Sequence, residues 1–335
     1  MNASEITVLQ QKILSAVTVR CGSISLVPVL CDLLHLSKSA VYDRINSTKS
    51  LSFPELIVLL DTFSISLEEM MAVKPERISF LTNSILTPVK NGQTYLKALQ
   101  EHVTAFAQTD GLRVWFSSPS LPFFHHMHFR ELALFKLFAY ARINWQLSYT
   151  ENLVFHPDTF PEKFLYEQYM QPIIALYSQL PTTEFCSDDL YYHTLRQIQY
   201  FSDSGQITDT TVISVLMEQL ANLCDHQQEM AKHGKKWVHG SKKQPETAQC
   251  GKLDLYYNEI SPATISLLLE SPSAKGVFTV LDDPNFMYSD NPYLYEYTLA
   301  WMHKLRVKCV RISEDAERER RIYFNRIREQ IKGGR

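Results

Sequence analysis

The stretch from residue 36 to residue 71 constrains the fold of this 335-residue chain more than any other. It reads LSKSAVYDRINSTKSLSFPELIVLLDTFSISLEEMM and places a short polar helix, SKSAVYDRIN, directly before an apolar one, FPELIVLLDTF. Both helices have a start signal, because Ser37 stands at the first N-cap position and Ser52, Pro54 and Glu55 form a capping-box pattern at the second. Most side chains of the polar helix would face water. Core packing does not explain such a helix, whereas a binding partner outside the chain does.

The residues around this stretch read as a compact set of short helices. ITVLQQKILSAV has apolar residues at helical spacing, and SLVPVLCDLLHL is a second helix that tolerates Pro28 in its first turn. SLEEMM repeats the cap-and-acid signal at Ser66. We therefore expect a helical N-terminal domain over residues 1–75.

Within this domain, the residues from Val27 to Arg44 match the helix-turn-helix pattern. Leu30, Leu34, Leu36 and Val41 occupy the apolar positions of this pattern. Cys31 occupies the small position at which the two helices touch, and His35 occupies the turn position. Histidine replaces the usual glycine of the turn, which is compatible with a positive φ. Arg44 stands at a position that is usually apolar, and Ile45 is the expected replacement in the packing.

The whole stretch from residue 36 to residue 71, about a tenth of the chain, resembles the Cro/repressor-like (XRE, BetR-type) DNA-binding domains of bacterial transcription regulators. PSLPFFHHMHFRELALFKLFAYAR and FTVLDDPNFMYSDNPYLYEYTLAWMHKL also look like segments of bacterial regulators in which such a domain precedes a long C-terminal body. The resemblance implies that the polar helix enters the major groove of double-stranded DNA with its N-terminal side chains at base edges. The expected DNA-binding residues are Ser37, Lys38, Ser39, Tyr42, Arg44 and Lys49.

The charge of the N-terminal domain favours a dimer. Its 75 residues hold six lysines and arginines and seven acids, so phosphate neutralisation by one copy would be modest. Two copies on two half-sites double the contacts. We therefore expect a homodimer.

The rest of the chain is expected to be mainly helical, followed by a smaller mixed region. Residues 76–90 read as a linker, residues 91–240 as a helical regulatory or dimerisation domain, and residues 250–335 as a small α+β domain. The middle domain begins with an amphipathic helix at 91–110, then has a short extended or loop segment, GLRVWFSSPSLP, and includes FRELALFKLFAYARINWQL, which is apolar nearly all round and so expected to be buried. In the last domain, KLDLYYNEI, ATISLLLES and KGVFTVLDD are expected strands, and two helices follow them.

Metal and catalytic sites are weakly indicated. His125, His128 and Glu131 form one conceivable stripe of ligands, but HHMH is better explained as a loop-to-helix junction with partly exposed imidazoles, and Cys224, His226, His233 and His239 fit no zinc spacing. Asp282 and Asp283 precede Pro284, where carboxylates more often cap a turn than act in catalysis. The GxSxG, P-loop and GxGxxG patterns do not occur. We expect no enzyme activity, no metal and no cofactor.

The 17 tyrosines and 18 phenylalanines leave two interpretations open. At helical spacing they are usually core residues, but they also suit a pocket for a flat or apolar effector. An effector of the regulator, small molecule or protein, is therefore one expectation.

Localisation follows from composition. The first residues lack a secretory signal, no apolar run is long enough for a membrane span, and the six cysteines are scattered, as in a reduced cytoplasmic protein. The sequence predicts a cytoplasmic, homodimeric, sequence-specific DNA-binding transcription regulator of mainly α fold. The alternative is an effector-binding or enzymatic protein whose helical N-terminal domain contacts a protein partner.

Overall fold

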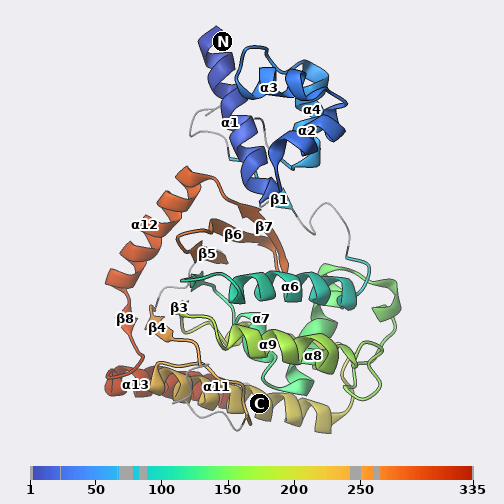
Figure 1. Ribbon diagram of the computed structural model, residues 1–335. Helices are drawn as coiled ribbons and strands as arrows, with labels where there is room; N and C mark the ends of the chain where they lie inside the picture. The colour runs from blue at the N-terminus through green and yellow to red at the C-terminus, as the bar shows by residue number, and fades with distance from the viewer. Residues whose placement is uncertain are drawn as a thin grey trace. The chain divides into compact units, whose positions relative to one another are not determined.

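The computed structural model divides the chain into two units, Met1–Ser79 and Phe80–Arg335, which we call the head and the body (Figure 1). The residues that the structure describes are 3–22, 24–65, 67, 78–82, 89–241, 250–259 and 265–333. Most of the predicted SLEEMM segment lies outside the described residues.

Four described helices build the head, and each contributes to one small core. They are α1 (Ala3–Cys21), α2 (Leu26–Leu34), α3 (Lys38–Ile45) and α4 (Phe53–Thr62). The buried core residues are Leu14, Val17, Leu30, Val41, Leu59 and Ile65. The four predicted helices are thus present.

The local signals read from the sequence of the head are confirmed. Ser37 caps α3 through its hydroxyl oxygen, which accepts a hydrogen bond from the backbone N–H of Ala40 at 3.3 Å. Ser52 and Glu55 form the reciprocal capping box of α4. His35 ends α2 in the left-handed region, at φ 53°, so a histidine does take the turn position that glycine usually holds.

The body is organised around one eight-stranded sheet in the order β1-β7-β6-β5-β2-β3-β4-β8. Among the described strands, β2, β3 and β4 run parallel to one another, and every other pair in the sheet is antiparallel. The strands are β1 (Leu81–Thr82), β2 (Arg113–Ser117), β3 (Thr182–Cys186), β4 (Leu253–Tyr257), β5 (Ser266–Glu270), β6 (Lys275–Asp282), β7 (Asn285–Ser289) and β8 (Val310–Arg311). Helical crossovers join β2 to β3 and β3 to β4, as parallel pairing requires.

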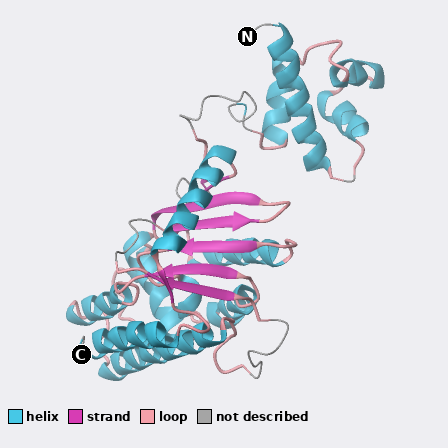
Figure 2. Cartoon of the chain, turned by 90° about the vertical axis from the view of Figure 1, so that its left-hand side faces the viewer, coloured by secondary structure: helices cyan, strands magenta, loops and turns pink. Residues whose placement is uncertain are grey.

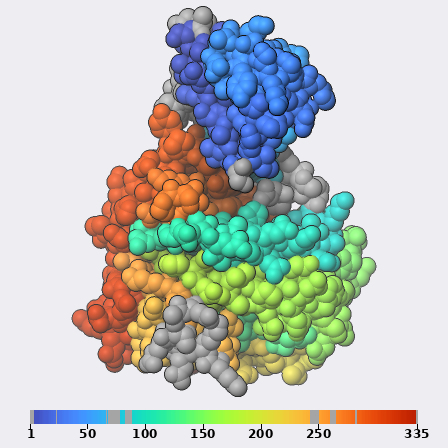
Figure 3. Space-filling model, in the orientation of Figure 1, coloured from blue at the N-terminus to red at the C-terminus, as the bar shows by residue number. Residues whose placement is uncertain are grey.

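The two faces of the sheet are covered unequally. Among the described helices, α12 covers one face (Figure 2). Its Tyr295 and Met302 pack on Trp115 and Leu268. The larger core, on the other face, is formed with α6 (Gly92–Ala107), α7 (Phe123–His126), α8 (Arg130–Ala139), α9 (Gln171–Tyr177), α10 (Tyr192–Asp203), α11 (Thr210–His233) and α13 (Glu317–Gly333). Helix α12 spans Pro292–Lys308, and short π and 3-10 segments lie at Tyr140–Asn144, Ser148–Thr150 and Tyr166–Met170. Figure 3 shows α6 running across the surface of the body next to α9.

The chain is helix-rich, as predicted, and its described strands form one mixed sheet, but the predicted separation of a helical middle domain from an α+β C-terminal domain is corrected. The middle region supplies β2 and β3, which lie between β5 and β4 in the same sheet. Strand β3, TTEFC, is buried at every position, so it shows no alternation of polar and apolar residues. The two predicted domains therefore share one sheet and one unit.

The expected linker at 76–90 also contributes to the body. Leu81 and Thr82 pair with Tyr288 and Met287 at the edge of the sheet. Among the described helices, none is by itself long and apolar enough to cross a membrane, and α1 and α2 reach that length and composition only together, across a bend of 108°.

Candidate nucleic-acid interface

Helix α3 turns one face into the core of the head and the other to the surface. Val41 is 1% exposed and anchors the inner face. Lys38 and Ser39, in the first turn, are exposed, and the Tyr42 side chain, one turn further on, is 52% exposed. The structure thus brings together three of the predicted site residues on the outer side of the first turns of this helix.

The N-terminus of α3 is electrostatically suited to an anion. Its backbone N–H groups carry the positive end of the helix dipole, and its first turn contains no acid. Lys38 adds a full positive charge at the same end. The exposed Ser37 cap occupies only the Ala40 N–H among these groups, so the helix end is a favourable position for a phosphate oxygen.

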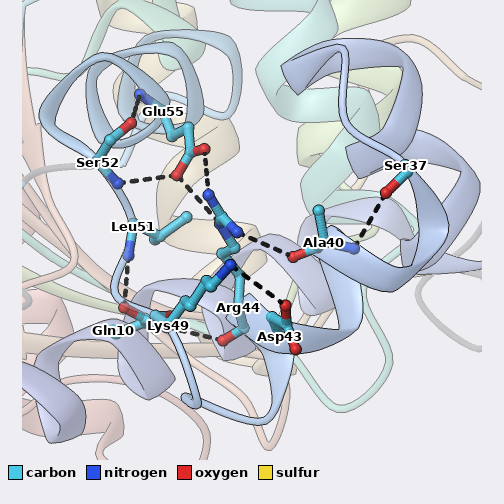
Figure 4. Close-up of polar contacts among 9 residues, drawn as sticks. All are labelled: Gln10, Ser37, Ala40, Asp43, Arg44, Lys49, Leu51, Ser52 and Glu55. Atoms are coloured by element: carbon cyan, nitrogen blue, oxygen red, sulfur yellow. Dashed lines mark hydrogen bonds and ion pairs between the residues drawn. The ribbon is translucent and has the colours of Figure 1, made fainter.

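Arg44, one of the expected DNA-binding residues, contacts other parts of the head in the structure (Figure 4). Its guanidinium donates to both carboxylate oxygens of Glu55, at 3.0 Å and 3.4 Å, and to the backbone oxygen of Ala40. The Arg44 and Glu55 side chains are only 15% and 13% exposed. Arg44 therefore ties α3 to the start of α4, because the same carboxylate accepts the Ser52 N–H of the capping box at 2.8 Å.

The protonation of Glu55 is consistent with this bracing role. Burial alone would raise its pKa, but the Ser52 N–H and the Arg44 guanidinium outweigh burial, and the pKa is lowered. The carboxylate is thus charged at neutral pH. A bidentate arginine–carboxylate pair fixes orientation as well as distance, so it holds α3 in a defined orientation relative to the start of α4.

Gln10, on α1, is a positioning residue that the sequence reading missed. Its side-chain amide donates to the backbone oxygens of Arg44 at 2.7 Å and of Lys49 at 3.0 Å, and its oxygen accepts from the backbone N–H of Leu51 at 2.8 Å (Figure 4). The residue is 5% exposed. One signal pointed to it: Gln10 is polar but lies one helical turn before Ile13 and Leu14, on the apolar face of α1.

Lys49 lies in the loop that Gln10 holds, next to the end of α3. Its side chain is 67% exposed, and its ammonium group is 3.9 Å from the Asp43 carboxylate. An exposed pair at this distance is weak and is easily exchanged for another anion. Lys49 is therefore placed at the surface, beyond the C-terminal end of α3, separate from the first-turn group of Lys38 and Ser39.

The histidines of HHMH are not partly exposed, as the sequence reading expected, but buried. His125 Nε2 lies 2.9 Å from Glu184, a β3 carboxylate that also accepts hydrogen bonds from Tyr177 and Thr182. His126 Nε2 lies 2.9 Å from the Thr194 hydroxyl. These rings serve as polar links between α7 and its neighbours inside the core.

His226 and His239, from the second group of candidate ligands, lie next to His128 of the HHMH segment in the structure. The rings of His128 and His226 lie 4.6 Å apart, and those of His226 and His239 lie 5.1 Å apart. Burial lowers the pKa of His226 to about 4, and that of His128 falls well below its usual value for the same reason. Within the described part of the chain, no group of three or more histidine, cysteine, aspartate or glutamate side chains is arranged to hold a metal ion.

Comparison of the chain with protein-family models, with curated proteins and with solved structures finds no match. The functional assignment of the head therefore depends on its geometry and on the resemblance of its sequence.

Proposed function

We propose that the protein is a sequence-specific DNA-binding transcription regulator of the Cro/repressor-like type, acting in the cytoplasm as a homodimer. One observation carries the proposal: Lys38, Ser39 and Tyr42 lie exposed on the first turns of a short helix whose opposite side is buried. That is the arrangement in which the second helix of a helix-turn-helix pair presents its N-terminal side chains to base edges.

Each residue has a role in this proposal. Ser39 and Tyr42 contact base edges, while Lys38 contacts a guanine edge or a phosphate near the positive end of α3. Lys49 contacts the phosphate backbone. Arg44 and Gln10 position the helix and its following loop, so their contribution to DNA binding is indirect.

The proposal includes a second copy of the chain because one head carries little net positive charge. Six bases and seven acids in the first 75 residues give one copy few phosphate contacts. The body is the part proposed to dimerise and to sense a signal, since it holds most of the chain and its own large core.

The test is binding of the full-length chain to duplex DNA. Sequences are first selected from a pool of genomic fragments, and the affinity for the selected duplex is then measured at several salt concentrations. We expect a preference over a shuffled duplex and a linear fall of log affinity with log salt, with a slope of about −0.9 per phosphate contact. A chain that selects no sequence and shows no salt dependence is not a DNA-binding regulator.

A protein partner for the head is the second candidate, and one observation favours it. On α4, Phe53 and Ile57 lie one helical turn apart and are 73% and 49% exposed. Neighbouring apolar side chains at this exposure are typical of a protein contact. If the full-length chain selects no duplex DNA but captures a protein, and Phe53→Ala with Ile57→Ala abolishes that capture while the oligomeric state is unchanged, the head is an adaptor and not a DNA reader.

A further inference from the structure

Helix α12 has large apolar side chains on its outer face as well as on the face that packs on the sheet. Tyr295 and Met302 are buried against the sheet, and no other described helix of the body covers the outer side (Figure 2). On that side Tyr293, Tyr297 and Val307 are 61%, 74% and 83% exposed. A helix that lies on a sheet normally has polar residues on its outer face, so large apolar side chains there indicate a contact with another surface.

The outer face of α12 has the spacing of a helix that packs against another helix. Five exposed residues follow one another at intervals of four, three, four and three positions: Tyr293, Tyr297, Ala300, Lys304 and Val307. Alternating steps of four and three keep side chains on one stripe of a helix, as at the contact positions of a coiled coil. We call these five residues the α12 stripe. Within the described part of the body, no second helix lies opposite it.

The α12 stripe and its flanking glutamate are self-complementary about Ala300. Tyr293 and Val307 lie seven residues before and after Ala300, and Glu296 and Lys304 lie four residues before and after it. In an antiparallel pair of identical helices that cross at Ala300, each of these residues meets its counterpart from the other copy. Tyrosine then packs on valine twice, and glutamate faces lysine twice. The small side chain of Ala300 allows the two helices to approach closely where they cross.

The charges on this face distinguish the two directions in which identical helices can pair. Glu296 and Lys304 are exposed, and neither belongs to an ion pair within the described part of the chain. They lie about 12 Å apart along the helix axis, too far to pair with each other. A parallel pair in register would place each charge against its own copy, which is unfavourable, whereas an antiparallel pair places opposite charges together. The stripe therefore fits a second copy of itself in the antiparallel direction.

We propose that two copies of the body associate through α12, as an antiparallel helix pair with its two-fold axis at Ala300. This proposal rests on the homodimer of the proposed function and names the surface that forms it. Two tyrosines from each copy supply most of the apolar contact, and tyrosine is enriched where proteins bind one another. The exposed ion pairs add little affinity, but they fix the direction and the register of the two helices. The contact involves the body alone and does not require DNA.

The experiment measures the dimer dissociation constant of the full-length chain by analytical ultracentrifugation without DNA. Glu296→Lys and Lys304→Glu each turn both attractive pairs of the dimer into repulsive ones, so each should raise the dissociation constant about tenfold. The double variant that carries both changes should dimerise like the unmodified chain, because opposite charges face each other again. An equimolar mixture of the two single variants should do the same. Contacts within one chain cannot produce rescue in the mixture, so this result tests the pairing itself.

One further variant and one control complete the test. Tyr297→Ser removes the ring from both copies and should raise the dissociation constant about a hundredfold. Lys332→Glu makes the same charge change as Lys304→Glu at an exposed position of α13 and should have no effect. Thermal unfolding checks that each variant folds.

The outcomes separate this surface from the homodimer itself. A dimer that none of the changes on α12 weakens, or a mixture that stays as weak as its components, would overturn the α12 contact and leave the homodimer in place. If the unmodified chain is monomeric at every concentration, the homodimer and the α12 contact are both wrong, and the exposed face of α12 is assigned to a partner other than a second copy.

Discussion

Replacing Gln10 by alanine should loosen the part of the head that follows α3. The side chain makes three hydrogen bonds to backbone groups of residues 44, 49 and 51, at 2.7–3.0 Å, and is nearly excluded from water. At a net contribution of about 1 kcal/mol each, their loss lowers the free energy of local opening by about 3 kcal/mol. That corresponds to roughly a hundredfold increase in the population of the open form.

Amide hydrogen exchange of the full-length chain measures this effect. Peptides that cover residues 38–51 should exchange about a hundred times faster in Gln10→Ala, while peptides from the body should be unchanged, since the body is a separate unit. Gln11→Ala is the matched control, because Gln11 is the exposed neighbour of Gln10 on the same helix. If the two variants exchange at the same rate, the three hydrogen bonds do not hold the loop and the positioning role of Gln10 is refuted.

Three further predictions concern assembly, DNA contacts and pH. The full-length chain should be a dimer at micromolar concentration by light scattering, and a strict monomer with and without DNA would contradict the charge argument. Lys38→Ala and Tyr42→Ala should change sequence preference at single positions at a cost of about 1–3 kcal/mol, whereas Lys49→Ala should weaken all duplexes alike and reduce the salt slope by about one. Burial lowers the pKa of His226 to about 4, below its usual 6.5, so the unfolded chain binds the proton first and stability falls as the pH drops from 6.5 towards 4. Between pH 7 and 5, the free energy of unfolding, measured with urea, should therefore fall by about 2 kcal/mol less in His226→Gln than in the unmodified chain. The exposed control is His193→Gln, and if both variants have the same pH profile, His226 does not contribute.

The head was predictable because its signals are local. The caps at Ser37 and Ser52 act on N–H groups three residues away, and the His35 turn depends on the backbone preference of one residue. The exposed positions of Lys38 and Tyr42 follow from the helical period once Val41 is assigned to the core. Local chemistry fixes each of these features, so the sequence is enough to find them.

The contacts that brace the same surface were not predictable in this way. Gln10 and Arg44 are 34 residues apart, and the Arg44–Glu55 pair joins two different helices. Arg44 was expected to contact DNA because a helical pattern predicts which residues of one helix are exposed. The pattern does not predict which side chains of the next helix contact those residues. The neighbours of a basic side chain near a predicted interface must therefore be known before that side chain is assigned to ligand binding.

The sheet shows the same limit on a larger scale. The three segments predicted as strands near the C-terminus are confirmed as β4, β5 and β6, because each is a short apolar run between turn signals. Strand β3 was missed because it contains Glu184, which is stable inside the core only through partners on other elements, including His125 at a distance of 59 residues in the sequence. Because of this buried carboxylate, the sequence of a central strand has the pattern of a polar segment.

The aromatic residues had two interpretations from the sequence, as core residues or as the lining of an effector pocket, and the effector stays a prediction. Phe138, Phe155 and Phe201 pack against one another with ring centroids 5.1 Å apart for two of the pairs, and they are at most 1% exposed. Phe278 and Phe286 also lie close together, at 5.3 Å, but they form one wall of a cavity under α6. The residue type is the same in both places, and the distances between ring centroids are similar. What differs is the surroundings, because Phe278 and Phe286 face Leu99 and Val103 of α6 across this cavity of about 110 Å³, which no described side chain fills.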